Sequence, residues 1–274
     1  MKIRAALIAG VSAAVLAGCV DMQSTVRLKP NGSGTLTMEQ YFSPQMTSMM
    51  GSMAGMAEAM GGTTGETNAP AAQPDPLAMF SDTIEQQIKS LGSSVKLEKK
   101  ESATNAAGWK GFKLICSFED INKVNLHNVG ASDASGEGEE SEEKPMSITF
   151  TPGKPAKLVI IEPETPAVAA EPEAAPEGMD PQAMMQMMAP MMAGMRMRMV
   201  IEVDGKIVKT NAKYVEGNRV TLADVSMDKV MANAEGGKLI ASAQNDPAAM
   251  TKLAALNIEG VKINTEKTLE IEFE

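Results

Sequence analysis

Methionine is the residue whose number and spacing could support chemistry in this sequence. The chain has 24 methionines in 274 residues, and two segments concentrate them, one within residues 46–60 and one within residues 184–195. The methionines of these segments are Met46, Met49, Met50, Met53, Met56 and Met60, then Met184, Met185, Met187, Met188, Met191, Met192 and Met195. Steps of three and four residues put thioethers on one helical face, although Gly51, Gly55 and Pro190 disfavour a helix there.

Three interpretations of the methionines are open. They could fill an irregular core that is short of aromatic residues. They could form an adaptable apolar surface for acyl chains or apolar peptides, because flexible thioethers repack around varied partners. They could bind Cu(I), which favours soft sulfur ligands. We favour the second and expect Met184, Met188 and Met191 to line a ligand groove, without a metal, because the only histidine, His127, is far away in sequence.

Other catalytic patterns are missing from the sequence. A single histidine allows neither a His pair for zinc nor an H-E-x-x-H motif. The sequence also lacks a G-x-S-x-G elbow and a G-x-x-x-x-G-K-[ST] phosphate loop. The acidic run Glu139–Glu143 is typical of a solvated surface. We therefore expect a protein that is not an enzyme and carries no cofactor.

The N-terminus has the layout of a cleavable secretory signal. Lys2 and Arg4 precede an uncharged run that ends in Leu16-Ala17-Gly18-Cys19. As a helix this run would span about 20 Å, which is shorter than the ~30 Å core of a bilayer. Because Leu-Ala-Gly-Cys resembles the lipobox of bacterial lipoproteins, we expect residues 1–18 to be removed and Cys19 to carry acyl chains. Several acyl chains hold a protein on a membrane almost irreversibly.

The residues directly after Cys19 indicate whether the lipoprotein stays at the inner membrane or is transported to the outer membrane. In lipoproteins of this kind, an Asp directly after the cysteine favours the inner membrane, whereas Val20 stands there in this chain and Asp21 follows. The resemblance therefore implies the outer membrane, on the periplasmic side.

The net charge limits the classes of molecule that the protein can bind, and the cysteine content indicates where Cys116 lies. The formal charge is −10 and becomes −12 once Lys2 and Arg4 are removed. A surface this acidic repels phosphate backbones, so we expect no nucleic acid partner. Protein partners cannot be named from the sequence. Cys116 is the only other cysteine, and strand alternation places it in the core with Phe112, Leu114 and Phe118.

Three stretches break the hydrophobic patterning. Residues 61–74, 131–144 and 163–178 are rich in Gly, Ala, Pro, Ser or Glu. They cannot bury enough apolar surface to offset the entropy of ordering. We interpret them as disordered inserts in one lipid-anchored domain, residues 19–274.

The strand signals are alternating apolar residues separated by turns. Asn31-Gly32-Ser33-Gly34 separates two such strands, Asp204-Gly205 predicts a type I′ hairpin between Met197–Val203 and Ile207–Lys213, and Gly217-Asn218 predicts another turn. Since tight turns join most neighbours, we expect a largely antiparallel sheet. Further strands are expected at Met22–Leu28, Leu36–Phe42, Val95–Leu97, Phe112–Phe118, Met146–Phe150, Leu158–Ile161, Val220–Val225, Ile258–Ile263 and Thr268–Phe273.

Helix starts share the motif Asp-Pro-x-Ala-Met at Asp75, Asp180 and Asp246. Asp can cap the helix and Pro suits its first position. The first helix should lay one apolar stripe on the sheet and end at Gly92, which is an α+β arrangement. The stripe residues that we expect to contribute to the ligand groove are Leu77, Phe80, Ile84 and Ile88.

Several short blocks together resemble the LppM-type lipoprotein domain of bacterial cell envelopes. They are the strand and turn of residues 26–34, Gly108-Trp109-Lys110-Gly111-Phe112, residues 205–212, and Gly217-Asn218-Arg219-Val220-Thr221. The resemblance implies an α/β fold with an apolar cavity between sheet and helix, and binding of envelope glycolipids. The chain departs from the family at Leu222, where an aromatic residue is usual, and in its methionine-rich segments.

The overall prediction is an α+β domain with a mainly antiparallel sheet and packed helices, tethered to a membrane through Cys19. Its expected function is non-catalytic binding of a lipid or glycolipid in a Met- and Leu-lined groove. The alternatives are a periplasmic Cu(I)-handling protein and a structural or assembly partner in an envelope complex.

Overall fold

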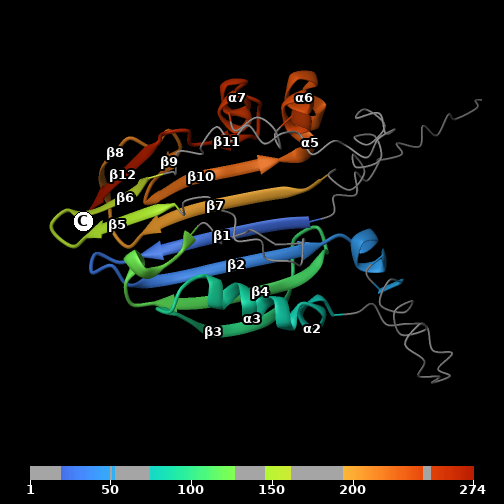
Figure 1. The fold of residues 1–274 in the computed structure, drawn as a ribbon, viewed down its shortest axis with the longest axis horizontal. Helices are drawn as coiled ribbons and strands as arrows, with labels where there is room; N and C mark the ends of the chain where they lie inside the picture. The colour runs from blue at the N-terminus through green and yellow to red at the C-terminus, as the bar shows by residue number, and fades with distance from the viewer. Residues whose placement is uncertain (1–19, 50, 53–74, 127–145, 162–193, 243–247) are drawn as a thin grey trace, which may run out of the picture.

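The computed structural model describes residues 20–49, 51–52, 75–126, 146–161, 194–242 and 248–274 (Figure 1). Several predictions lie outside these residues and are not tested by the structure. They concern the signal sequence, Cys19, His127, the three inserts, the second Asp-Pro motif, and Met184, Met188 and Met191.

A large sheet of eight strands forms the centre of the molecule (Figure 1). Its order is β11-β10-β7-β1-β2-β4-β3, with β9 paired to β10. All pairs are antiparallel except β1 and β7, which run parallel. The strands are β1 (Val20–Leu28), β2 (Gly34–Phe42), β3 (Val95–Thr104), β4 (Lys110–Phe118), β7 (Arg196–Val203), β9 (Val215–Glu216), β10 (Arg219–Ser226) and β11 (Lys262–Ile263).

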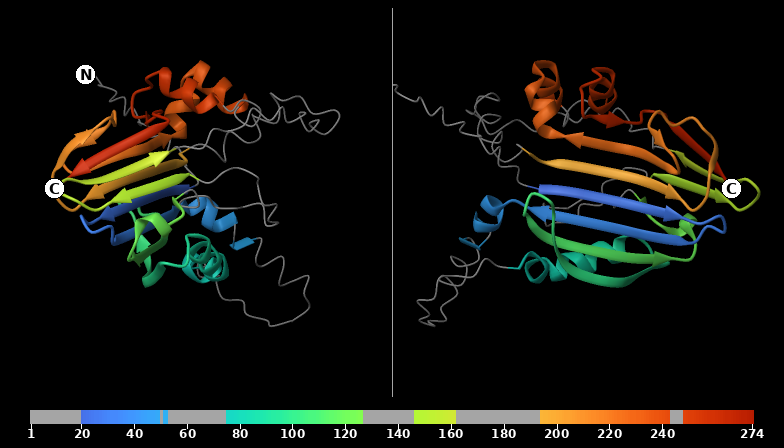
Figure 2. Two further views of the ribbon diagram at one scale, coloured as in Figure 1. Left: turned by 60° about the vertical axis from the view of Figure 1, so that its left-hand side comes forward. Right: turned by 180° about the vertical axis from the view of Figure 1, so that it is seen from behind.

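A smaller antiparallel sheet of order β5-β6-β12-β8 packs on one face of the large sheet (Figures 1 and 2). Phe150 and Phe273 of the small sheet belong to the same buried cluster as Val26 and Leu36 of the large one. Its strands are β5 (Ser147–Thr151), β6 (Ala156–Ile161), β8 (Ile207–Thr210) and β12 (Thr268–Phe273). The predicted α+β class with mainly antiparallel pairing is therefore confirmed, with two sheets in place of one.

Alternation along β1 sets the two faces of the large sheet. Met22, Ser24, Val26 and Leu28 are buried while their neighbours are partly or fully exposed, as the period of two in the sequence predicts. We call the side of these buried residues the front face and the other side the back face. On β4 the same alternation buries Cys116 with its three predicted neighbours, so that prediction is confirmed.

The first predicted helix is present, in two parts that lie on the front face over β3 and β4. α2 (Pro76–Met79) begins where the Asp75 Oδ1 accepts a hydrogen bond from the Leu77 N–H at 3.0 Å, which confirms the cap. α3 (Ser81–Ser90) follows after Phe80, and Gly92 then takes a φ of 114°. The short η1 (Ile121–Lys123) comes after β4.

The hairpin predicted at Asp204-Gly205 is wrong. β8 pairs with β12 in the small sheet rather than with β7. The Lys206 N–H donates to the Glu274 carbonyl at 2.7 Å, and a Cβ on Gly205 would lie 2.0 Å from that same oxygen. Glycine is thus required here for a close approach to the last residue, while the chain crosses between sheets. The Gly217-Asn218 turn between β9 and β10 is confirmed.

Three helices near the C-terminus pack on β10 and β11 around a second, smaller buried cluster. Val230 and Leu253 are its most buried members. The helices are α5 (Met227–Ala232), α6 (Ala234–Ser242) and α7 (Ala249–Ala255). A helix does follow the third Asp-Pro motif, because α7 begins at Ala249 with Ala248 as its N-cap, whereas the predicted cap Asp246 lies outside the described residues.

Candidate functional site

The four apolar residues predicted on one face of the first helix are not equally buried: some lie in the core and others at its edge. Ile84 is 1% exposed and belongs to the main core. Phe80 stacks on Phe42 of β2, with ring centroids 5.1 Å apart, and lies 6.3 Å from Phe112 of β4. Leu77 and Ile88 are half-buried and pack against the same cluster. The structure thus brings these four residues together over the β2–β4 side of the front face.

Beside this helix, methionines gather on the front face of three adjacent strands. Met22 of β1 pairs in register with Met197 of β7, and Ser24 of β1 pairs with both Met38 of β2 and Met199 of β7. Met22 and Met38 are 7% and 6% exposed, Met199 is half-buried, and Met197 is 44% exposed. We call these four methionines the methionine face. It offers an apolar, pliable surface that is open at one margin.

The methionine face was not predicted as a unit. Alternation along the chain predicts the inward side of β1 and β2 and places Met197 and Met199 on one face. The sequence does not predict the parallel pairing of β1 with β7. This pairing joins segments more than 160 residues apart, and no local turn in the sequence indicates it. The local methionine signal is strongest in the two methionine-rich segments, and most of their residues lie outside the described part.

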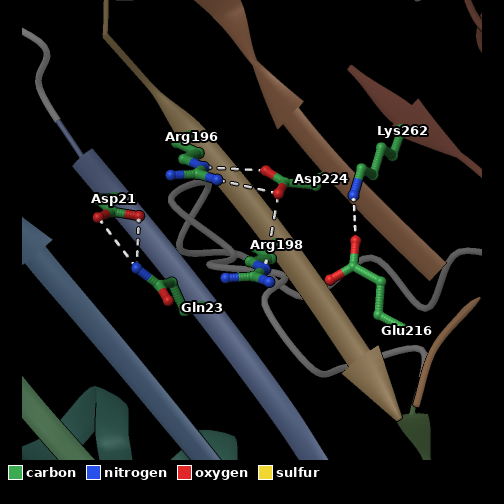
Figure 3. Close-up of polar contacts among 7 residues, drawn as sticks. All are labelled: Asp21, Gln23, Arg196, Arg198, Glu216, Asp224 and Lys262. Atoms are coloured by element: carbon green, nitrogen blue, oxygen red, sulfur yellow. Dashed lines mark hydrogen bonds and ion pairs between the residues drawn. The ribbon is translucent and has the colours of Figure 1, made fainter. Parts of the chain in front are cut away.

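The back face carries a second cluster, which is charged (Figure 3). Asp224 of β10 accepts two hydrogen bonds from Arg196 of β7, from Nε and Nη2, each at 2.9 Å. The Nε of Arg198 lies 3.6 Å from the same carboxylate. Asp224 is only 8% exposed as a residue, so this arrangement places a buried carboxylate between two guanidinium groups.

Opposite charges account for the pKa shifts in this cluster. The hydrogen bond to Asp224 raises the pKa of Arg196 above its ordinary value, against a lowering by burial. Further along the face, the Lys262 ammonium donates to Glu216 at 2.9 Å and lowers the pKa of that carboxyl. These ion pairs join β7 to β10 through Arg196 and Asp224, and β9 to β11 through Glu216 and Lys262.

Cys116 is the one described thiol and it is fully buried. Burial, and next the negative charge of Glu98, raise the pKa of the Cys116 thiol from 9.0 to about 11. A protonated, inaccessible thiol is a small apolar core group rather than a nucleophile.

The described residues contain neither a metal-binding cluster nor a membrane-spanning helix. Among the residues that the structure describes, no group of three or more His, Cys, Asp or Glu side chains is arranged to hold a metal ion. Within the same residues, no helix combines the length and apolar character needed to cross a bilayer.

Comparison with known proteins adds a distant likeness. No protein-family model matches the chain, and no curated protein matches its sequence. The solved NMR structure of the folded domain of LppM from Mycobacterium tuberculosis is similar in chain course, with a TM-score of 0.34 and 9% identity, over 94% of this chain and 91% of that one. A TM-score this low carries no inference about function, and the resemblance to that family stays a prediction.

Proposed function

We propose that this protein is a bacterial envelope lipoprotein, anchored through Cys19, that binds the acyl chains of a lipid or glycolipid without catalysing a reaction. The observation that carries the proposal is the methionine face, where four thioethers from three neighbouring strands surround one serine and Met197 is 44% exposed. The proposed location is the periplasmic side of the outer membrane, because Val20 and not an acid follows the anchor cysteine.

The side chains of the methionine face and its neighbours suit the binding of an acyl chain. Methionine has three rotatable bonds and a polarizable sulfur, so a row of methionines can adapt to a flexible acyl chain. The stacked rings of Phe42 and Phe80 border this row and give it a rigid apolar wall. Ligand sites of this kind combine apolar lining with few polar groups. The polar residues here are Ser24, which is 7% exposed, and the half-buried Gln40, which pairs in register with Met22.

The decisive experiment compares lipid binding and stability in the same variants. Met197→Gln and Met199→Gln should lower the transfer of a fluorescent phospholipid from vesicles to the protein, with little change in melting temperature, because a wet or lipid-filled face tolerates an amide. Met250→Gln is the matched control, since Met250 is 46% exposed on α7 and should leave transfer unchanged. Equal losses of binding and melting temperature would return these methionines to the core and contradict the proposal.

A copper titration of the wild type and of a Met197→Leu variant tests the alternative of Cu(I) handling. Thioethers without imidazole or thiolate ligands bind Cu(I) weakly, so anaerobic titration should give no dissociation constant tighter than micromolar. A sub-nanomolar value that Met197→Leu abolishes would favour Cu(I) handling over lipid binding.

A further inference from the structure

β1 begins directly after the predicted anchor. Its first residue is Val20, which is already paired with Phe42 of β2. Neighbouring Cα atoms are about 3.8 Å apart across a peptide bond, so no spacer separates Cys19 from the sheet. An acyl chain on Cys19 would therefore hold this end of β1 at the membrane surface.

Several strands end at the same level. In register with Val20 lie Phe42 of β2, Lys110 of β4 and Thr104 of β3. On the other side of β1, Arg196 of β7 lies opposite Asp21, and Figure 1 shows the start of β1 and the start of β7 side by side. We call this row of strand ends the anchor edge. At about 4.8 Å per strand its five strands extend over roughly 20 Å.

The β3–β4 turn places the only tryptophan of the chain at the anchor edge. Trp109 is half-buried and directly precedes the exposed Lys110. The Asn105 side chain fixes the turn, because its Oδ1 accepts hydrogen bonds from the backbone N–H groups of Ala107 and Trp109, each at 3.0 Å. Tryptophan and lysine are enriched where proteins meet the headgroup region, since each has an apolar body and a polar end.

An exposed methionine adjoins the same edge. Residues 44–49 form a helical turn that starts just after β2, where the Ser43 Oγ accepts a hydrogen bond from the Met46 N–H at 3.2 Å. Met49, within this helical segment, is 44% exposed. Figure 3 shows Arg196 at the start of β7 facing Asp224, so this cation is already balanced by a carboxylate. The edge therefore presents Trp109, Met49 and Lys110, and its acidic residues Asp21 and Asp224 both lie beside Arg196.

We propose that the anchor edge docks on the bilayer, with the strands of the large sheet standing away from the membrane and Trp109, Met49 and Lys110 at the level of the headgroups. This orientation rests on the acylation of Cys19 in the proposed function. It places the Asn31–Gly34 turn, at the far end of β1, about 30 Å from the membrane, since nine residues of strand rise by about 3.3 Å each.

The single tryptophan makes the orientation measurable. Full-length acylated protein is reconstituted into phosphatidylethanolamine–phosphatidylglycerol vesicles, with and without phospholipids that carry bromine on their acyl chains. Trp109 emission should shift to shorter wavelength and be quenched by the brominated lipids. The control is the double variant Trp109→Phe/Lys29→Trp, whose tryptophan stands at the exposed position 29 beside the far turn and should be neither shifted nor quenched.

The outcomes distinguish this orientation from the proposed function. Equal quenching of the two tryptophans, or none, in protein that is acylated and bound to vesicles overturns the orientation and leaves lipid binding at the methionine face intact. An unmodified Cys19 by intact-mass analysis overturns both the anchor and the orientation. Met197→Gln should lower lipid transfer while Trp109 remains quenched, because Met197 lies on the front face and not in the β3–β4 turn.

Discussion

The front and back faces of the large sheet hold the molecule together by different means. On the front, Val26, Leu36 and Leu114 are at most 1% exposed, beneath the first helix and the small sheet. On the back, seen in the right-hand view of Figure 2, no described helix or strand covers the central strands. Charges pair across those strands instead, as Lys113 does with Glu39 at 2.8 Å.

The front face should supply most of the stability of the fold, whereas the charges of the back face should help to set the register of the strands. Apolar burial supplies most of the stabilising free energy in folding, so the front face should dominate the stability of the protein. Exposed ion pairs contribute little energy each, but opposite charges at cross-strand positions favour one register over its neighbours.

The largest expected effect is on the front face. Leu114→Ala should lower the free energy of unfolding by about 2–5 kcal/mol, the range for truncating a buried leucine. Ile115→Ala, one residue further on the same strand, is the matched control because it removes a half-exposed side chain from the back face. Its cost should be about 1 kcal/mol. Chemical denaturation of the two variants measures both, and equal losses would contradict the assignment of faces.

Alkaline pH should weaken the front face through Cys116. The folded-state pKa of about 11 lies above the ordinary value of 9.0, so the thiol contributes stability that is present below pH 9 and lost as the pH rises towards 11. Two pKa units correspond to about 2–3 kcal/mol. Denaturation between pH 8 and 11 should show a smaller loss in Cys116→Ala than in the wild type. Identical pH profiles would refute the burial of this thiol.

On the back face, removing the shared carboxylate should have an intermediate effect. Asp224→Asn leaves Arg196 and Arg198 without their counter-charge, and we expect a loss of about 1.5–3 kcal/mol, as for a hydrogen bond to a charged group. Asp204→Asn is the control, because its 3.4 Å contact with Arg27 is exposed on both sides. Thermal melts should show almost no change for the control, and a loss as large as that of Asp224→Asn would undo the distinction.

The smallest effect should come from the Glu216–Lys262 pair at the exposed margin. Lys262 lowers the pKa of Glu216, so the pair stabilises the fold above the ordinary carboxyl pKa and this contribution is lost as the pH falls through the lowered value. NMR titration should show the Glu216 pKa rising in Lys262→Gln, with no measurable change in melting temperature at neutral pH. An unchanged Glu216 pKa would mean that the pair does not form in solution.

The sequence predicted correctly those features of the fold that depend on residues close together in the chain. The alternation of β1 and β4, the buried Cys116, the Asp75 cap and the Gly217-Asn218 turn follow from neighbouring residues and were confirmed. The Asp204-Gly205 hairpin failed because its outcome depends on Glu274, 69 residues later in the chain, and no rule about turns includes that partner.

The candidate site was predicted only in part for the same reason. Leu77, Phe80, Ile84 and Ile88 share the front face as their spacing predicted. The methionine face and the Arg196–Asp224 cluster both depend on β7, which reaches its place through a parallel pairing with β1. A sequence read segment by segment contains each strand but not the order in which a sheet assembles them.

The position of β1 has a mechanical consequence for an anchored protein. β1 is flanked over its length by β2 on one side and β7 on the other. A pull transmitted through Cys19 would act along the axis of this strand, and the interstrand hydrogen bonds lie across that axis. The bonds on both sides would be loaded together in shear, so drag on the domain would meet the resistance of the whole strand rather than peel one bond at a time.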